Sequence, residues 1–401
     1  MNTEERTALV QRMHKTPHKV AMAITGGGAE VIGELLRHGN GSATLLEAVV
    51  PYDQAAFTQY IRGVPDKFCS PEAARDLAMA AFLRAIEFER HAPVGKENLI
   101  GLGASCSLAK PDGERTGREH RAYIAVQTAM ATTTFNFDLL NSWKLGPEGQ
   151  QREMTREQEE SFVADRILEI IAETMGLGSS EYINNSWMTC IQSQPKLLDL
   201  LTGKEKYIAL ESGAAWRREA PQRRVIFSGS FFPIHQGHLN IAKKASELTN
   251  SLVDFEVCIH NVDKPSLNFQ SFQERLETMR NSLKGTSCAE ILFTSTPKFV
   301  EKAEIFPNST FVVGWDTFRR IADAKYYGEE GLKNVLTRFR QLNTKFLVFH
   351  RIINGKSSAC DSLSCIPGEL IAMSTICGED VFTPSNYSSS AIRKEALFLR
   401  K

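Results

Sequence analysis

Two histidines, His235 and His238, lie in a stretch whose pattern can bind phosphate. The apolar run 225–227 is typical of a short buried strand, and the small residues at 228–230 interrupt it. A helical pattern begins near His238. Where a strand, a glycine turn and a helix start follow one another, free backbone N–H groups and the helix dipole point at an anion. Because the two imidazoles would add donors at the same point, this stretch is the main clue to the chemistry of the chain.

The composition is that of an ordinary globular protein. With 401 residues the chain is long enough for two or three domains, and 42% of its residues are hydrophobic. Because 47 basic residues balance 47 acidic ones, nothing suggests general binding to nucleic acid or to an anionic membrane. No apolar run approaches the roughly 18 residues of a membrane span. The charged N-terminus argues against a signal or transit peptide, so we expect a cytoplasmic protein.

The eight cysteines are scattered along the chain, and no Cys-x-x-Cys pair occurs. A metal site would need clustered ligands, and a disulfide framework is typical of a much smaller secreted chain. We therefore expect reduced structural thiols and no metal held by the protein itself.

Alternating strands and helices predict an α/β protein with two domains. We expect a first domain at 1–176, a connecting segment with one mixed helical stretch at 177–222, and a second domain at 223–401. The first domain should contain strands at 19–24 and 44–50, a strand followed by a loop of small residues within 98–107, a β-rich stretch at 122–133, and helices at 3–15, 29–37, 70–89 and 155–175. The second should contain strands near 225–227, 253–259, 290–294, 310–313 and 345–349.

The first domain carries a diffuse resemblance to a known family. It rests on Thr25-Gly26-Gly27, the segment 49–52, the helix at 70–89, the loop at 101–107 and the strand at 122–127. Over residues 8–175 these features resemble the C-terminal domain of the competence-damage-induced (CinA) family, whose members are nicotinamide-nucleotide amidases. The resemblance implies a CinA-like α/β fold.

The amidase motif of that family is altered in this chain. The family has Ala-Glu-Ser-Cys-Thr-Gly-Gly with the serine as proposed nucleophile, whereas residues 21–27 are Ala-Met-Ala-Ile-Thr-Gly-Gly. Met22 replaces the glutamate, and Phe57 stands where the family has a lysine. Since the methyl group of an alanine has no lone pair to attack an amide, we expect no amidase activity. The degenerate site implied by the resemblance consists of Ala23, Thr25, Gly26, Gly27 and Tyr52, the last matching the assisting tyrosine of the family.

Three hypotheses remain open for this region. Ser105 or Cys106 could supply a substitute nucleophile, although an activated nucleophile also needs a positioned base. The glycines at 26–28 could be only a strand-to-helix turn in a scaffold or dimerisation domain. The third hypothesis is a pocket that still binds a nucleotide without hydrolysing it.

The second domain carries a more specific resemblance. Residues 229–238 are Gly-Ser-Phe-Phe-Pro-Ile-His-Gln-Gly-His, and the segments 261–265, 311–318 and 387–393 follow them in matching order. Together these segments resemble the nicotinate/nicotinamide mononucleotide adenylyltransferases of the H-x-G-H nucleotidylyltransferase superfamily. The resemblance implies a Rossmann-like domain with a parallel sheet, and ATP and a pyridine mononucleotide as substrates. Mg²⁺ would come with ATP, bridging phosphate oxygens mostly through water.

Adenylyl transfer needs an in-line attack of a phosphate oxygen on the α-phosphorus of ATP, and its catalysis rests on positioning and charge stabilisation. The resemblance and this chemistry together suggest His235, His238, Lys264 and Arg393 as catalytic residues. Backbone N–H groups and a serine-capped helix would bind the phosphates of ATP. The expected ATP-binding residues are Gly229, Ser230, Phe231, Gly237, Gly314, Asp316, Ser388, Ser389 and Ser390.

Two further residues, Trp315 and Arg275, are candidates for binding the acceptor substrate. The tryptophan could stack on a base or pack in the core. Three alternatives to a pyridine mononucleotide adenylyltransferase stay open: a phosphopantetheine-like acceptor, CTP in place of ATP, and a non-catalytic nucleotide-binding scaffold. We also expect a homo-oligomer, because a scaffold domain joined to an enzyme domain favours self-association.

Overall fold

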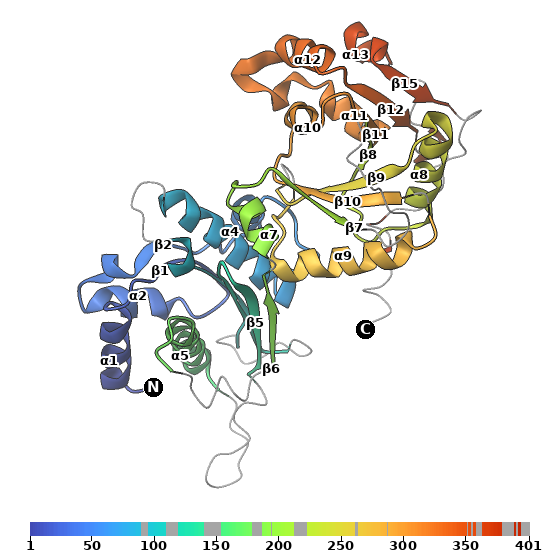
Figure 1. Ribbon diagram of the computed structural model, residues 1–401. Helices are drawn as coiled ribbons and strands as arrows, with labels where there is room; N and C mark the ends of the chain where they lie inside the picture. Colours follow the sequence, from blue (N-terminus) through green and yellow to red (C-terminus); the bar gives the residue numbers. More distant parts are fainter. Residues whose placement is uncertain are drawn as a thin grey trace. The chain divides into compact units, whose positions relative to one another are not determined.

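The chain forms two compact units, each built on its own sheet (Figure 1). The first unit comprises Met1–Leu198 and Asn261–Gln270, and the second Asp199–His260 and Ser271–Lys401. This computed structural model describes residues 1–89, 95–109, 119–139, 154–178, 187–193, 195–211, 223–260, 264–286, 288–350, 352–353, 356–357, 363–378, 389 and 392–393.

The first unit contains a mixed six-stranded sheet of order β2-β1-β3-β4-β5-β6. The pairs β2–β1 and β1–β3 are parallel, and the three remaining pairs are antiparallel. The strands are β1 (Lys19–Thr25), β2 (Leu45–Val49), β3 (Leu99–Ser107), β4 (Arg121–Gln127), β5 (Ala131–Asp138) and β6 (Trp187–Gln192). The predicted β-rich stretch at 122–133 lies in a hairpin of β4 and β5, and at its turn the hydroxyl of Thr128 accepts the N–H groups of Met130 and Ala131.

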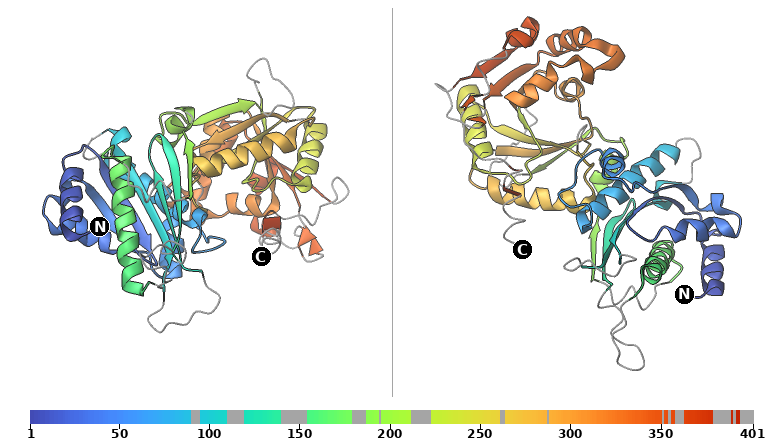
Figure 2. Two further views of the ribbon diagram at one scale, coloured as in Figure 1. Left: turned by 90° about the horizontal axis from the view of Figure 1, so that it is seen from below. Right: turned by 180° about the vertical axis from the view of Figure 1, so that it is seen from behind.

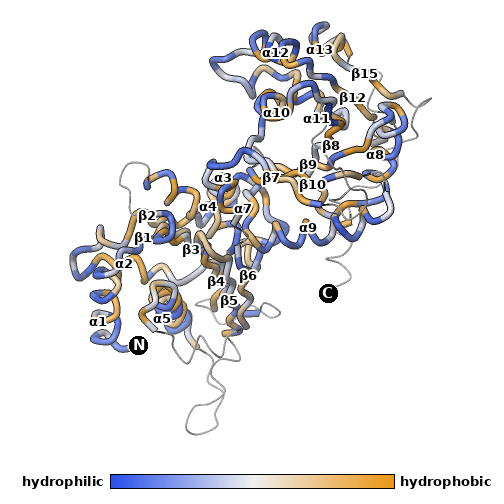
Figure 3. Tube along the Cα trace, viewed as in Figure 1, coloured by the Kyte–Doolittle hydropathy of each residue, from blue (hydrophilic) through white to orange (hydrophobic). Residues whose placement is uncertain are grey.

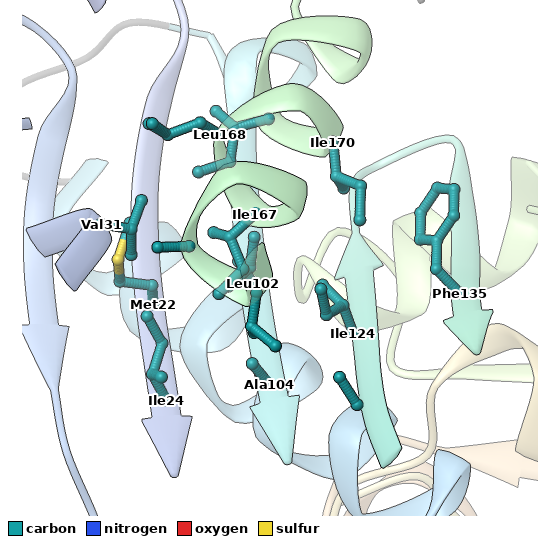
Figure 4. Close-up of a cluster of buried hydrophobic side chains, with 14 of the residues drawn as sticks. Met22, Ile24, Val31, Leu102, Ala104, Ile124, Phe135, Ile167, Leu168 and Ile170 are labelled. Atoms are coloured by element: carbon teal, nitrogen blue, oxygen red, sulfur yellow. The ribbon is translucent and has the colours of Figure 1, made fainter. Parts of the chain in front are cut away.

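Helices cover both faces of this sheet. On one face, Ile167 of the long helix α5 packs in one buried cluster with Met22 and Leu102 of the strands (Figure 4). On the other face, Ala74 and Ala78 of α4 pack against the sheet. The helices are α1 (Thr3–Met13), α2 (Glu30–Arg37) and α5 (Arg156–Thr174) on the first face, with α3 (Gln54–Ile61) and α4 (Pro71–Glu89) on the second.

The close approach of α4 explains the glycines of β3. A Cβ atom on Gly103 would lie 2.2 Å from the carbonyl oxygen of Ala74, and one on Gly101 would lie 2.3 Å from that of Ala78. Only glycine lets the helix backbone come this near. The predicted loop of small residues within 101–107 is therefore wrong: these residues continue β3, hydrogen-bonded to β1 and β4 on its two sides.

The predicted connecting segment contributes to both sheets. Strand β6 pairs antiparallel with β5 in the first sheet, and β7 (Tyr207–Glu211) pairs antiparallel with β10 in the second. Only α7 (Pro195–Leu201) is helical among its described residues. Short edge strands such as these depend on partners distant in the sequence, so their local pattern did not reveal them.

The second unit contains a seven-stranded sheet of order β15-β12-β11-β8-β9-β10-β7, parallel except for β7. The parallel strands are β8 (Val225–Ser228), β9 (Val253–Cys258), β10 (Cys288–Thr294), β11 (Thr310–Gly314), β12 (Lys345–Phe349) and β15 (Ser374–Cys377). Counted along the chain, they lie in the order 6-5-4-1-2-3. In this Rossmann arrangement the strand order reverses between β8 and β11, and ligands bind beyond the carboxyl ends of the strands at that point.

Helices again lie on both faces. Phe272 of α9, the long helix seen beside the sheet in two further views (Figure 2), packs on Phe293 of β10. Leu292, which points to the opposite face, belongs to the buried cluster formed with α10, α11 and α12. The helices are α8 (Gln236–Thr249), α9 (Phe269–Leu283), α10 (Phe299–Ile305), α11 (Trp315–Ile321), α12 (Gly331–Gln341) and α13 (Gly368–Ala372), and a small ribbon pairs β13 (Ile352–Ile353) with β14 (Lys356–Ser357).

Hydropathy along the chain follows this layering: the central strands are largely hydrophobic, whereas α1 and α9 carry long hydrophilic stretches (Figure 3). Within the described ranges, no helix is both long enough and apolar enough to span a membrane.

A buried ion pair joins β9 to α10 next to the last residue of β8. The ammonium group of Lys302 is 2.7 Å from the carboxylate of Glu256, and the two residues are only 4% and 0% exposed. The hydroxyl of Thr294 donates to the other carboxylate oxygen. The main-chain carbonyl of Glu256 accepts the N–H of Gly229 at 3.0 Å, so this residue also holds the first residue after β8.

We predict that Lys302→Ala lowers the free energy of unfolding by about 3–5 kcal/mol, because it leaves the carboxylate of Glu256 buried and without its cation. Urea denaturation, monitored by circular dichroism, measures the change in the free energy of unfolding. Lys333→Ala, which removes an exposed lysine of α12, is the matched control and should change little. Equal effects of the two substitutions would contradict the assigned role of the buried pair.

Candidate active site

The loop between β8 and α8 lies where the strand order of the second sheet reverses. Strand β8 pairs with β9 on one side and with β11 on the other, with Phe227 opposite Val312. Gly229 begins the loop, and a Cβ atom there would lie 2.7 Å from the ring of Phe231. Phe231 has a positive φ of 44° and is 1% exposed. The glycine therefore allows an aromatic ring to fold back under the loop and anchor it in the core.

The two histidines lie at the start of α8. His235 is the N-cap residue, and its N–H donates to Nδ1 of His238 at 3.2 Å. The two rings stack with centroids 3.7 Å apart. His238 is 8% exposed and packs against Phe231, with 5.0 Å between the ring centroids. Because Nδ1 accepts a hydrogen bond, the neutral imidazole of His238 carries its proton on Nε2 and can donate from that atom.

Residues near the C-terminus are attached to this loop. The hydroxyl of Ser389 donates to the carbonyl of Pro233 at 2.9 Å, and Nη1 of Arg393 donates to the carbonyl of Phe232 at 2.5 Å. The structure therefore joins these two predicted residues to a loop about 160 positions earlier. Of the same predicted group, Ser388 and Ser390 lie outside the described residues.

Arg275 reaches the same loop from α9. Its Nη1 donates to the carbonyl of Ser230 at 3.3 Å. The guanidinium groups of Arg275 and Arg393 lie 4.8 Å and 5.6 Å from the ring centroid of Phe232, so both cations contact one aromatic side chain. Sequence reasoning missed Phe232 as a functional candidate, because its two cationic neighbours come from distant segments.

Strand β11, the neighbour of β8 in the sheet, ends at Gly314. Gly314 caps α11, and Asp316 is exposed in the first turn of that helix. Trp315, in contrast, is 1% exposed and packs against Phe318 and His350, with ring centroids 5.9 Å and 5.2 Å away. Of the two alternatives left open for this tryptophan, the described contacts are those of core packing.

Lys264 is exposed, and it belongs to the segment 261–270 that groups with the first unit. A Cβ atom on Gly63 would lie 3.2 Å from the Cα of Lys264. The predicted role of this lysine beside the histidines stays a prediction.

The degenerate amidase site of the first unit borders two adjoining cavities of about 270 and 330 Å³. Both are lined by Thr25, Gly26, Tyr52 and Arg156, and Gly27 lines the larger one. Ala23 lies elsewhere: it is fully buried in an apolar cluster with Phe57, Ile61, Ala73 and Leu77.

The two candidate substitute nucleophiles in this region are buried. The hydroxyl of Ser105 donates to the carbonyl of Phe68 at 2.5 Å, and the residue is 1% exposed. Burial, with a smaller contribution from Cys69, raises the pKa of the Cys106 thiol well above its ordinary value. Because the thiolate is the nucleophilic form, these contacts do not activate Cys106.

Comparison with known proteins finds a family match over the second unit. Residues 226–395 match the family described as cytidylyltransferase-like, so this part of the chain is a nucleotidylyltransferase-like domain. A Schizosaccharomyces pombe protein, provisionally named as a nicotinamide mononucleotide adenylyltransferase, is 29% identical over 144 residues, which cover 33% of this chain and 55% of that protein. The phosphopantetheine adenylyltransferase of Mycoplasma capricolum is 43% identical over 67 residues, covering 17% and 45% respectively. The chain thus spans about half the length of the curated relatives it matches.

Solved structures of the competence/damage-inducible type also match the chain. One is CihA from Agrobacterium tumefaciens, with 15% identity and a TM-score of 0.33, covering 42% of this chain and 95% of that one. Another is a CinA superfamily protein from Escherichia coli, with 14% identity and a TM-score of 0.31, covering 43% and 88%. Since the TM-scores are this low, we base no conclusion on the likeness.

We predict that Cys106 resists alkylation by iodoacetamide at pH 8 in the folded protein, because its raised pKa leaves little thiolate. The exposed Cys190 and Cys365 should react under the same conditions. Peptide mass spectrometry reports the modified fraction of each cysteine, and a urea-unfolded sample shows that Cys106 can be labelled. Labelling of Cys106 at the rate of the exposed thiols would contradict its assignment as an unactivated group.

Proposed function

We propose that the second unit transfers an adenylyl group from ATP to nicotinamide or nicotinate mononucleotide, forming NAD or its deamido form and pyrophosphate. The observation that carries this proposal is the attachment of Ser389 and Arg393 to the loop 229–235 beside the stacked histidines. Hydrogen bonds thereby join the glycine turn and its histidines to a segment that carries Arg393, at the strand-order reversal where ligands bind in folds of this kind. The family match of residues 226–395 and the S. pombe relative support the same activity.

In the proposed reaction, an oxygen of the mononucleotide phosphate attacks the α-phosphorus of ATP, and the bond to the β-phosphate oxygen breaks. The N–H groups of the loop and Nε2–H of His238 would donate to the phosphate oxygens that gain charge. Arg393 and Arg275 would stabilise the leaving pyrophosphate. Catalysis of this kind comes from positioning and needs no covalent enzyme intermediate.

Magnesium would enter with ATP. It prefers oxygen ligands, and the side chains described around the loop offer mainly imidazole, guanidinium and hydroxyl groups. These side chains fit a magnesium ion that is coordinated by phosphate oxygens of ATP and by water rather than by a set of carboxylates. When bound, the ion would neutralise phosphate charge, while His238 and Arg393 orient the phosphates.

The second candidate is adenylyl transfer to a phosphopantetheine-like acceptor, which the M. capricolum relative favours. Transfer from CTP is a further alternative, in line with the description of the matching family. Assays that pair ATP or CTP with each acceptor separate these activities. We propose no amidase activity for the first unit, since Ala23 supplies no nucleophile and lies in an apolar cluster. Cytoplasmic location and self-association stay predictions.

We predict that the purified protein with Mg-ATP releases pyrophosphate when a pyridine mononucleotide is added. His238→Ala should lower kcat by about 10²–10³-fold, because one donor to the transferring phosphate is lost. A coupled pyrophosphate assay measures both, and circular dichroism checks the fold of the variant. Lys243→Ala, which removes an exposed residue of the same helix, should keep full activity. Absence of release with either mononucleotide, while a control enzyme works, would refute the proposed substrate.

A second prediction concerns Phe232. Phe232→Leu keeps the carbonyl that binds Arg393 but removes the ring under both guanidinium groups, at a cost of about 0.5–1 kcal/mol per contact. We expect the KM for ATP to rise by about 5–30-fold with a smaller change in kcat. Phe232→Tyr retains an aromatic face and should restore the KM. If leucine and tyrosine behave alike, the ring does not position the arginines.

A further inference from the structure

In the first unit, a carboxylate side chain of the protein binds the N–H groups of the turn that begins α2. The carboxylate of Glu160, from the first turns of α5, accepts the N–H of Gly28 at 2.8 Å and that of Glu30 at 3.3 Å. Gly28 has a φ of 87°, and a glycine turn followed by a helix start is the arrangement that binds phosphate in many proteins. In this chain the carboxylate of Glu160 accepts the hydrogen bonds that a bound phosphate would otherwise accept.

Close packing holds Glu160 in place. A Cβ atom on Gly28 would lie 2.7 Å from the side chains of both Val163 and Ile167, so the turn lies directly against α5. Both side chains are fully buried. An incoming phosphate would have to displace a carboxylate fixed on a packed helix, and it would meet like charge in doing so.

The larger cavity, of about 330 Å³, opens beside this turn. Its charged lining consists of the carboxylates of Glu30, Glu157 and Glu160 and the guanidinium of Arg156. Arg156 donates through Nη1 to the carbonyl of Ala109 at 3.0 Å, and Glu30 is 3.6 Å from the guanidinium of Arg6. Even with Arg6 counted, three carboxylates face two guanidinium groups.

An aromatic side chain also stands at this cavity. Tyr52 lines both cavities and is 65% exposed, so part of its ring is open to a ligand. An exposed aromatic face beside carboxylates suits a flat cation, which stacks on the ring and is attracted by its quadrupole. The volume falls at the small end of the range for ligand pockets, about 300–1,000 Å³.

We propose that this cavity binds a small flat organic cation that carries no phosphate group. The cation would stack on Tyr52 and lie near the carboxylates of Glu157 and Glu160. Glu160 acts as the specificity-determining residue, because it fills the anion position of the turn and adds negative charge to the cavity. The proposal is independent of the adenylyl transfer proposed for the second unit.

The test measures binding of three probes to the whole protein by ligand-observed NMR at pH 8. The N-methylpyridinium cation represents the proposed class, pyridine is its neutral counterpart of nearly the same shape, and inorganic phosphate is the anion. We expect the cation to bind at least 5-fold more tightly than pyridine, and Tyr52→Ala to weaken its binding at least 5-fold. Glu87→Gln, an exposed substitution on α4, is the matched charge control and should leave binding unchanged.

Glu160→Gln tests the role of the carboxylate. We expect it to weaken binding of the cation several-fold and to add phosphate binding at the turn of the first unit, where the unaltered protein has the carboxylate of Glu160. Phosphate that binds elsewhere in the chain gives the same signal in the variant and in the unaltered protein, so the difference between the two signals reports the turn alone. Because Tyr52 is exposed, Tyr52→Ala keeps the test valid if Glu160→Gln fails to fold.

Three outcomes would overturn the proposal: no binding of the cation, binding that Tyr52→Ala leaves unchanged, or equal binding of pyridine and the cation. Phosphate binding by the unaltered protein that depends on Tyr52 would also overturn it. None of these results affects the pyrophosphate assay, so failure here is distinguishable from failure of the proposed transferase activity.

Discussion

The candidate active site depends on how the main chain between β8 and α8 is held. Its first N–H bonds to the carbonyl of Glu256, and two of its carbonyls accept hydrogen bonds from Ser389 and Arg393. The side chain of Phe231 anchors the same loop in the core. With its backbone held at Gly229, Phe232 and Pro233, the loop can present histidines and N–H groups in one fixed geometry, and preorganised donors are what phosphoryl-type transfer requires.

The two units treat a similar local motif in opposite ways. Each has a strand that leads through glycine into a helix, which creates a set of free N–H donors. In the second unit the surrounding side chains are histidines and arginines, which suit an anionic ligand. In the first unit Glu160 occupies the donors and Ala23 replaces the nucleophile of the amidase motif. A glycine turn therefore provides N–H donors for an anion, and whether it binds a ligand depends on the neighbouring side chains.

Much of the fold was predictable because its signals are local. Four of the five parallel strands that were predicted in the second unit contain a short apolar run, and buried parallel strands have that pattern. The fifth, β9, alternates apolar residues with Asp254 and Glu256. The segments around Gly229, His238 and Gly314 were likewise found from a motif within a few residues. The strands β6 and β7 and the continuation of β3 through 101–107 were missed. Their pairing partners, or the helix that packs on them, lie far away in the sequence, so no local pattern distinguishes them from a loop.

The sequence by itself determined which groups are present: two histidines after a glycine turn, a serine and an arginine near the C-terminus, and an alanine where an amidase would need a serine. Only the tertiary structure decided which groups meet. It placed Arg275 and Arg393 on the ring of Phe232, buried Trp315 against His350, and set Glu160 on the N–H groups of Gly28 and Glu30. The physical reason is range: a motif is defined by covalent neighbours, whereas hydrogen bonds, stacking and burial depend on distances that chain folding alone creates.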